Sequence, residues 1–162
     1  MSKYIKNRRL AEDCWAHLAA SSSEVPTGSW IVPLAFWRAN KERLLNRIHE
    51  IGVMLEPADD PKELADVAGQ LPVIAIRFPS FTDGRGYSSA RLLRERHGFK
   101  GEIRAVGDVW RDQIFLMARC GFDAFELRED QDVEAVLAAF EDFSEVYQAA
   151  NDRGPLFARR FG

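Results

Sequence analysis

Residues 73–127 read VIAIRFPSFTDGRGYSSARLLRERHGFKGEIRAVGDVWRDQIFLMARCGFDAFEL. Short apolar runs in this stretch alternate with longer amphipathic patterns, and polar loops join the two kinds of segment. The apolar runs predict strands over residues 73–78, 102–106 and 124–127. The amphipathic patterns predict helices over residues 86–97 and 109–119, with Gly98 and Gly121 where C-terminal caps belong. Strands that alternate with helices are typical of right-handed βαβ units, so the stretch predicts an α/β fold with a parallel sheet.

The flanking sequence continues this alternation. Before it come an apolar run at 30–37 that predicts a strand, a helical run at 40–50, a short apolar run at 53–55 and a short helix at 61–68. After it, a final helix carries apolar side chains on one face, namely Val133, Val136, Leu137, Phe140, Phe143 and Tyr147. We therefore predict a small parallel-sheet βαβ sandwich. A partial (β/α) barrel is the alternative, because it uses the same repeating unit.

Length and composition fit one domain. The chain has 162 residues, of which 46% are hydrophobic, and this is enough for a single sizeable core. We expect residues 1–29 to form an irregular N-terminal extension with a hairpin around Asn7. Residues 30–162 are expected to form a single α/β domain.

The charge and hydropathy patterns limit the classes of partner. The net charge is −3 and no long block of like charge occurs, so no nucleic-acid partner is predicted. The start of the chain lacks the apolar core of a signal peptide, and no run of about 18 apolar residues occurs, so we expect a cytoplasmic protein without membrane contact. Residues 77–128 hold ten Lys and Arg against seven Asp and Glu. That local basic excess suits an anionic ligand or an acidic partner, and equally a solvated helix face.

Polar loops follow the predicted strands at their carboxyl ends, where α/β sheets and barrels bind ligands. In the first loop, Gly84 and Gly86 allow the backbone to approach a ligand, and Arg85 can bind an oxyanion through two hydrogen bonds. The candidate anion-binding residues are Asp83, Gly84, Arg85, Gly86, Tyr87, Asp108, Arg111 and Asp112. Glu126 and Arg128 in the third loop are expected to lie within reach of them. Sulfite, sulfate or a phosphate would fit such a site.

A structural interpretation of the same residues stands beside the functional one. Asp83 and Gly84 can form a turn, with Arg85 paired to Asp108 or Asp112 across the loops. Asp108 is also placed to cap the helix that follows it. The DGRG sequence matches neither the phosphate-binding loop nor the dinucleotide fingerprint, so the sequence pattern alone leaves both interpretations open.

Cysteine and histidine spacing predicts no metal site and identifies no cofactor. Cys14 and Cys120 lie far apart without CxxC spacing, and Cys120 is expected to be a buried apolar residue. His97 lies near the end of a predicted helix, and His17 and His49 are expected to be isolated, so no histidine is predicted to belong to a nucleophile or metal site. Arg91 and Arg94 share a helix face that suits an acidic redox partner, although surface solvation explains them as well.

Several motifs occur together in this chain: FTDGRGYS at 81–88, RLLRERHGFKGEIRAVGDVWRDQ at 91–113 and RCGFDAFEL at 119–127, with looser matches in WIVPLAFW at 30–37 and GVMLEPADDP at 52–61. With these motifs the chain resembles a family of small bacterial proteins of unknown function that are described as oxidoreductases of assimilatory sulfite reduction. The resemblance implies an association with sulfite reduction. It assigns no catalytic residue.

The first functional hypothesis is an accessory or redox protein of assimilatory sulfite reduction, whose partner is sulfite reductase or its electron donor. Direct redox action would need a bound cofactor or a partner's electrons, because side chains other than cysteine do not carry redox equivalents. One alternative is an enzyme that binds a small anion or a nucleotide and uses the loop carboxylates for acid–base chemistry, with arginines stabilising negative charge. Another is a non-catalytic partner protein.

Overall fold

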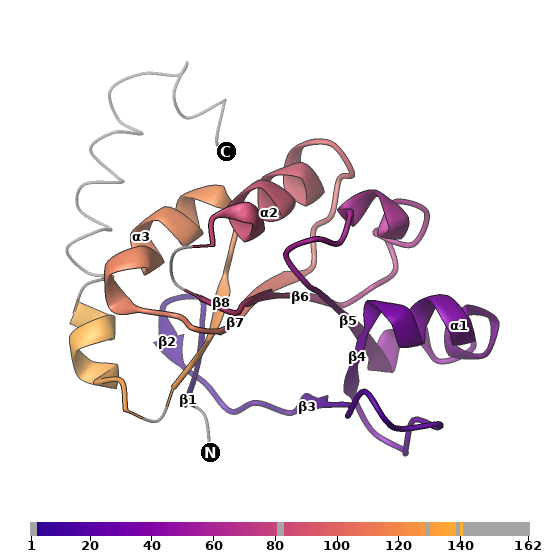
Figure 1. The fold of residues 1–162 in the computed structure, drawn as a ribbon. Helices are drawn as coiled ribbons and strands as arrows, with labels where there is room; N and C mark the ends of the chain where they lie inside the picture. The colour runs from indigo at the N-terminus through magenta and orange to yellow at the C-terminus, as the bar shows by residue number, and fades with distance from the viewer. Residues whose placement is uncertain (1–2, 81–82, 129, 139, 141–162) are drawn as a thin grey trace.

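An eight-stranded sheet, curled into a half-barrel, forms the centre of the protein in a computed structural model (Figure 1). The structure describes residues 3–80, 83–128, 130–138 and 140. From edge to edge the strands are β2 (Arg9–Leu10), β1 (Lys3–Lys6), β8 (Ala124–Leu127), β7 (Glu102–Gly107), β6 (Val73–Phe78), β5 (Ile51–Leu55), β4 (Trp30–Pro33) and β3 (Ala16–His17). The strands from β3 to β8 are parallel to their neighbours, whereas β1 is antiparallel to both β8 and β2.

The helices lie on one side of this sheet (Figure 1). They are α1 (Leu34–Leu45), α2 (Arg85–Glu95) and α3 (Arg111–Cys120), with short 3-10 segments η1 (Ile48–Glu50) and η2 (Pro61–Leu64). Because neighbouring parallel strands also follow one another in the chain, right-handed crossovers return on the same face each time. The α/β class is confirmed. The architecture is the partial barrel, our alternative, rather than a sheet with helices on both faces.

Alternate side chains of each strand point to opposite faces of the sheet. Ile74 and Ile103 are register partners whose side chains are buried in the main core together with residues of the helices. The other face, which we call the concave face, holds a smaller apolar cluster of Ile31, Val73, Ala75 and Val106, with Trp15 and Met54 packed against it. Glu102, Arg104 and Glu126 alternate with core-facing residues and project from this concave face.

The apolar run at 30–37 divides into a strand and a helix. β4 ends at Pro33 and α1 begins at Leu34, so the prediction of one apolar strand is wrong in its second half. Pro33 has a φ of −61°, and proline lacks the N–H of a strand ladder, which makes it suitable just before a helix. The helix expected over 40–50 ends at Leu45, and the helix expected over 61–68 is the 3-10 segment η2.

The first 29 residues contribute three strands to the sheet and are more regular than we expected. The hairpin around Asn7 is confirmed by the pairing of β1 with β2, and Asn7 and Arg8 both have a positive φ. Ile5 is fully buried in the main core. Beyond the hairpin, residues 11–15 cross from the β1 edge to the β3 edge on the side opposite the helices (Figure 1).

The final helix is confirmed over the part of it that the structure describes. Residues 133–138 and 140 are helical, and Val136 and Phe140 are buried in the main core. Phe143 and Tyr147, predicted on the same face, lie outside the described residues. No helix within the described ranges has the length and apolar character needed to cross a membrane.

Candidate functional site

The first predicted loop pairs its own charges. Arg85 donates from Nε and Nη2 to the two carboxylate oxygens of Asp83 at 3.1 and 2.9 Å. The side-chain hydrogen bond from Arg85 lowers the pKa of Asp83. Arg85 is therefore paired within its own loop rather than with Asp108 or Asp112. Its side chain is 63% exposed, and its part in anion binding stays a prediction.

The two glycines of this loop differ in their surroundings. A Cβ atom at Gly86 would lie 2.7 Å from Phe78 Cζ, which is closer than real Cβ contacts, so Gly86 allows α2 to pack directly on β6. Among the described residues, a Cβ atom at Gly84 would meet Tyr87 Cδ2 alone, at 3.8 Å. The Tyr87 ring itself packs on Phe78, with centroids 5.4 Å apart. Gly86 thus has a packing function that explains its place in the DGRG motif.

Asp108 does not cap the helix that follows it. Helix α3 begins at Arg111, its N-cap residue is Trp110, and no side chain caps it. The Asp108 carboxylate instead accepts hydrogen bonds from Trp110 Nε1 at 2.6 Å and Arg128 Nη1 at 3.0 Å. The prediction of a cap is wrong because the helix starts later than the sequence pattern indicates. The second and third loops nevertheless meet, since Arg128 also lies over the Trp110 ring at 5.0 Å.

Arg111 and Asp112 lie in the first turn of α3 and are largely exposed. Arg111 Nε is 3.9 Å from Asp112 Oδ1, and the two side chains are 55% and 91% exposed. They line a shallow hollow with Trp110, Gln131, Asp132, Ala135 and Val136. No hydrogen bond or ion pair within the described part of the chain joins Arg111 or Asp112 to Asp83 or Arg85.

An open depression lies where β6 and β7 end. Its lining combines two arginines, Arg77 and Arg128, with Phe78, Pro79, Gly107 and Asp108. Arg77 Nε donates to both carboxylate oxygens of Glu56 at 2.7 and 2.9 Å, while Arg128 contacts Asp108 and Asp130. Each arginine side chain is 44% exposed, so both side chains are partly open to solvent although their guanidinium groups are paired with carboxylates.

The arginines of α2 have structural contacts. Arg94 donates to the carbonyl oxygens of Phe99, Gly101 and Gly121 at distances of 3.0, 2.7 and 3.0 Å. It therefore joins α2 to the loops around it and is not part of a free basic face. Arg91 Nη2 lies 3.6 Å from the sulfur of Cys120. Cys120 is buried, as predicted.

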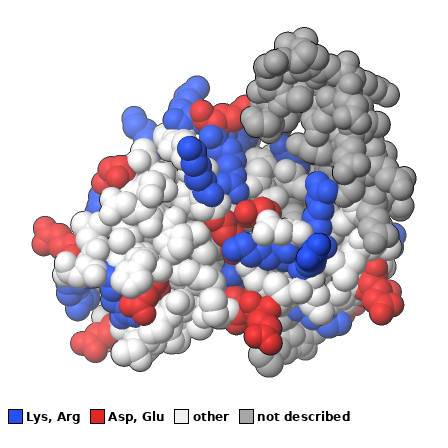
Figure 2. Space-filling model, turned by 180° about the vertical axis from the view of Figure 1, so that it is seen from behind, with Lys and Arg blue, Asp and Glu red and all other residues white. Residues whose placement is uncertain are grey.

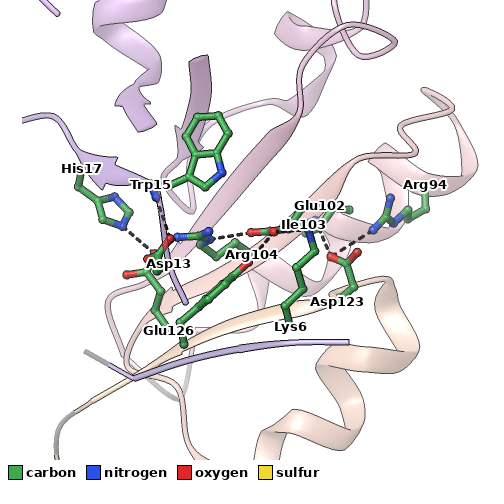
Figure 3. Close-up of polar contacts among 11 residues, drawn as sticks. Lys6, Asp13, Trp15, His17, Arg94, Glu102, Ile103, Arg104, Asp123 and Glu126 are labelled. Atoms are coloured by element: carbon green, nitrogen blue, oxygen red, sulfur yellow. Dashed lines mark hydrogen bonds and ion pairs between the residues drawn. The ribbon is translucent and has the colours of Figure 1, made fainter. Parts of the chain in front are cut away.

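A second group of polar residues, not predicted from the sequence, lies on the concave face (Figure 3). Its centre is Arg104, which is completely buried. Arg104 Nε donates to Glu102 Oε2 at 2.7 Å, and Nη1 donates to Asp13 Oδ2 and Glu126 Oε2, both at 2.9 Å. The guanidinium also lies 4.3 Å from the Tyr4 ring centroid. We call Tyr4, Lys6, Asp13, His17, Glu102, Arg104 and Glu126 the Arg104 cluster.

The outer members of the Arg104 cluster complete a continuous network. Tyr4 donates its hydroxyl hydrogen to Glu102 Oε1 at 2.6 Å, and Lys6 Nζ lies 3.0 Å from the same oxygen. His17 Nε2 lies 2.7 Å from Glu126 Oε2. His17 is therefore not isolated, and Glu126 faces the concave side rather than the edge where we expected it. Basic and acidic groups also lie side by side across the face shown in Figure 2.

Burial and hydrogen bonding act in opposite directions on the carboxylates of this cluster. Burial raises the pKa of Glu126, but hydrogen bonds from His17 and Arg104 outweigh it and hold the pKa below its ordinary value. Glu102 behaves in the same way, with burial opposed by Tyr4 and Arg104. For Tyr4, burial first and then the bond to Glu102 raise the pKa above its ordinary value. The cluster therefore holds a neutral phenol beside ionised carboxylates at neutral pH.

A weak signal for this cluster is present in the sequence. Glu102 and Arg104 are two residues apart in the strand EIRAV, so they share a face, and two charged residues on one face of an apolar strand indicate a buried polar network or an exposed face. The partners of Arg104 at positions 13 and 126 could not be found from spacing. Among the described residues, no group of three or more His, Cys, Asp or Glu side chains is placed to hold a metal ion.

The fold and its concave polar cluster define a class of protein, a small α/β half-barrel with a buried arginine at its centre. The chain belongs to the family described as "Bacterial protein of unknown function (DUF934)", which matches residues 52–157. None of the curated proteins matches the chain. The matched range includes Glu102, Arg104 and Glu126, together with the depression lined by Arg77 and Arg128.

Proposed function

We propose that the protein is an accessory or redox protein of assimilatory sulfite reduction, acts in the cytoplasm, and binds a small oxyanion at the depression lined by Arg77 and Arg128. The observation that carries the oxyanion part is the presence of two partly exposed arginine side chains in one depression. Guanidinium groups bind planar or tetrahedral oxyanions through paired hydrogen bonds. The association with sulfite reduction rests on the sequence motifs, and sulfite is accordingly the first anion to test.

The position of the depression supports the proposal. It lies at the carboxyl ends of β6 and β7, the end of the strands at which barrels and open α/β sheets bind their ligands. Gly107, between the two arginines, has a φ of +92° and a Cβ atom there would lie 2.5 Å from the carbonyl oxygen of Phe78. A glycine at this position keeps the strand end free of a side chain that would fill the depression.

Anion binding is tested by isothermal titration of the full chain with sodium sulfite, with sodium sulfate and sodium chloride as comparison salts. We expect sulfite to bind, and Arg77→Gln or Arg128→Gln to weaken binding by about ten-fold or more, the loss of a charge-assisted hydrogen-bond pair. Arg38→Gln is the matched control, since Arg38 is an exposed arginine that is also paired with a glutamate. A different result would place the anion in the first loop and overturn the assignment to the depression. In that result sulfite binding is weakened by Arg85→Gln and is unchanged in Arg77→Gln and Arg128→Gln.

The role in the pathway is tested separately. The rate of sulfite reduction by the host's sulfite reductase with its natural electron donor is measured with and without this protein. A rate increase that Arg128→Gln removes supports an accessory role. Anion binding without any effect on that rate would contradict the role in sulfite reduction and favour an independent enzyme that binds small anions.

A further inference from the structure

Residues 11–18, which we call the strap, lie against the concave face and make side-chain contacts typical of a bound peptide. Asp13 Oδ2 accepts a hydrogen bond from Arg104 Nη1 at 2.9 Å. Trp15, two residues later, packs against the small apolar cluster of the concave face. Only Ala16 and His17 of the strap form a strand, by pairing with Trp30 and Ile31 of β4 at the edge of the sheet. The strap therefore has two parts. Residues 11–15 contact the concave face through the Asp13 carboxylate and the Trp15 indole. Residues 16–18 are held to the sheet by the pairing with β4, by the 2.7 Å contact of His17 Nε2 with Glu126 Oε2 and by the burial of Leu18 in the main core.

The surface under the strap combines a cation with an adjoining apolar patch. Arg104 is the register partner of Ala75 on the neighbouring strand, and Glu102 is the partner of Val73. The concave face therefore changes from charged to apolar between β7 and β6. An acidic group followed closely by an aromatic ring matches this change, and Asp13 and Trp15 provide that pair (Figure 3).

Arg104 retains unused hydrogen-bonding capacity in this arrangement. Its Nη2 atom is buried and has no hydrogen-bond partner among the described residues, while Nη1 is shared between Asp13 and Glu126. A buried guanidinium N–H without a partner is costly, and guanidinium groups normally bind carboxylates through both nitrogens. The Asp13 carboxylate therefore accepts one hydrogen bond from Arg104, whereas a carboxylate in a bidentate position would accept two.

We infer that the concave face is a binding site for a segment of a partner protein that carries a carboxylate two residues before an aromatic side chain. Residues 11–15 of the strap occupy this site in the free protein and have to leave before the partner segment binds, whereas residues 16–18 stay on the sheet. Because the strap belongs to the same chain, its effective concentration is in the millimolar range, so a free peptide competes with it poorly. This site is separate from the depression lined by Arg77 and Arg128, and the inference does not depend on the proposed function.

The test uses a fluorescein-labelled peptide with the sequence of residues 10–18 and serine in place of Cys14. Its affinity is measured by fluorescence anisotropy for the wild-type full chain and for the double variant Asp13→Ala, Trp15→Ala, which removes the two side chains by which residues 11–15 contact the site. We expect the double variant to bind the peptide about ten-fold or more tightly than wild type. Two altered peptides, one with asparagine in place of the aspartate and one with alanine in place of the tryptophan, should each bind about ten-fold or more less tightly than the unaltered peptide.

The inference would be overturned if the peptide bound wild type and a cooperatively unfolding double variant with equal affinity. It would also be overturned if the unaltered peptide and the two altered peptides bound with equal affinity. If the double variant does not fold, Asp13→Asn alone serves instead, since it weakens the bond to Arg104 and keeps the indole. We expect it to bind the peptide more tightly than wild type, and no gain would overturn the inference. A wild-type dimer in size-exclusion chromatography that Asp13→Asn abolishes would assign the site to a second copy of the chain and overturn the choice of partner.

Discussion

Arg104 and Glu126 meet on the concave face although they belong to different strands, with Arg104 Nη1 donating to Glu126 Oε2 at 2.9 Å. The same oxygen lies 2.7 Å from His17 Nε2. One carboxylate oxygen thus connects β7, β8 and the strap. Taking such charges out of water is costly, and a buried ion network often contributes less to stability than an apolar core of the same volume. Its presence at the centre of a half-barrel is the physical reason for regarding the concave face as functional.

Replacing Arg104 by methionine is expected to reduce the free energy of unfolding by about 3–5 kcal/mol. The change leaves the carboxylates of Glu102, Glu126 and Asp13 without their shared cation. Urea denaturation followed by circular dichroism measures the loss in free energy of unfolding. Arg38→Met is the matched control, because Arg38 and Glu63 are exposed and an exposed ion pair contributes little to stability. Equal losses in the two variants would contradict a buried network.

Gly86→Val is expected to destabilise the protein by roughly 1–3 kcal/mol, since the new side chain would push α2 away from Phe78. Gly84→Val in the same loop should cost less than about 1 kcal/mol, because the φ of −88° at Gly84 is ordinary and no atom of the described residues that surround the loop lies within 3.4 Å of its Cβ position. Thermal unfolding of the two variants provides the comparison. A larger loss for Gly84→Val would show that the loop, rather than the contact between helix and strand, requires glycine.

Acid is expected to destabilise the protein through Glu126. The pKa of Glu126 is lower in the folded protein than in the unfolded chain, so the unfolded chain binds protons first as the pH falls. The stabilisation is complete above the unfolded pKa, near 4.3, and is lost as the pH falls through the folded pKa. Urea denaturation between neutral pH and pH values near 3 should therefore show a smaller pH dependence for Glu126→Gln than for wild type. If the free energy of unfolding depended on pH equally in the variant and in wild type, Glu126 would not form the hydrogen bonds that the structure shows.

Asp123 should have the opposite effect. Burial raises the pKa of Asp123 in the folded protein, against the hydrogen bond from the Ile103 N–H and the charge of Arg94. As the pH falls, the Asp123 carboxylate binds a proton in the folded protein before it does so in the unfolded chain. Asp123 therefore contributes stability at acid pH, and this contribution is lost as the pH rises through the folded pKa. Asp123→Asn keeps an oxygen for the Ile103 N–H, which lies 2.8 Å away, and removes the buried charge. We expect a more stable variant at pH 7 and a difference that shrinks on acidification; a less stable variant at pH 7 would refute this.

Local sequence patterns predicted much of the fold. The strands β6, β7 and β8 lie where the apolar runs indicated, and Gly121 ends α3 with a φ of +115°. Such features depend on interactions over a few residues, which are visible in the order of the side chains. The start of α3 was less well predicted, because Asp108 has a more favourable partner in Arg128, twenty residues away, than in the helix that follows.

The sequence by itself determined that this is an α/β protein with polar loops at the carboxyl ends of its strands. Only the tertiary structure decided which charged residues meet. The bond between Arg104 and Asp13 joins residues 91 positions apart, and it exists because the strap crosses the curled sheet from the β1 edge to the β3 edge. The order of the strands and the curl of the sheet follow from packing of the whole chain, so a site assembled from separate strands cannot be derived from spacing within any one of them.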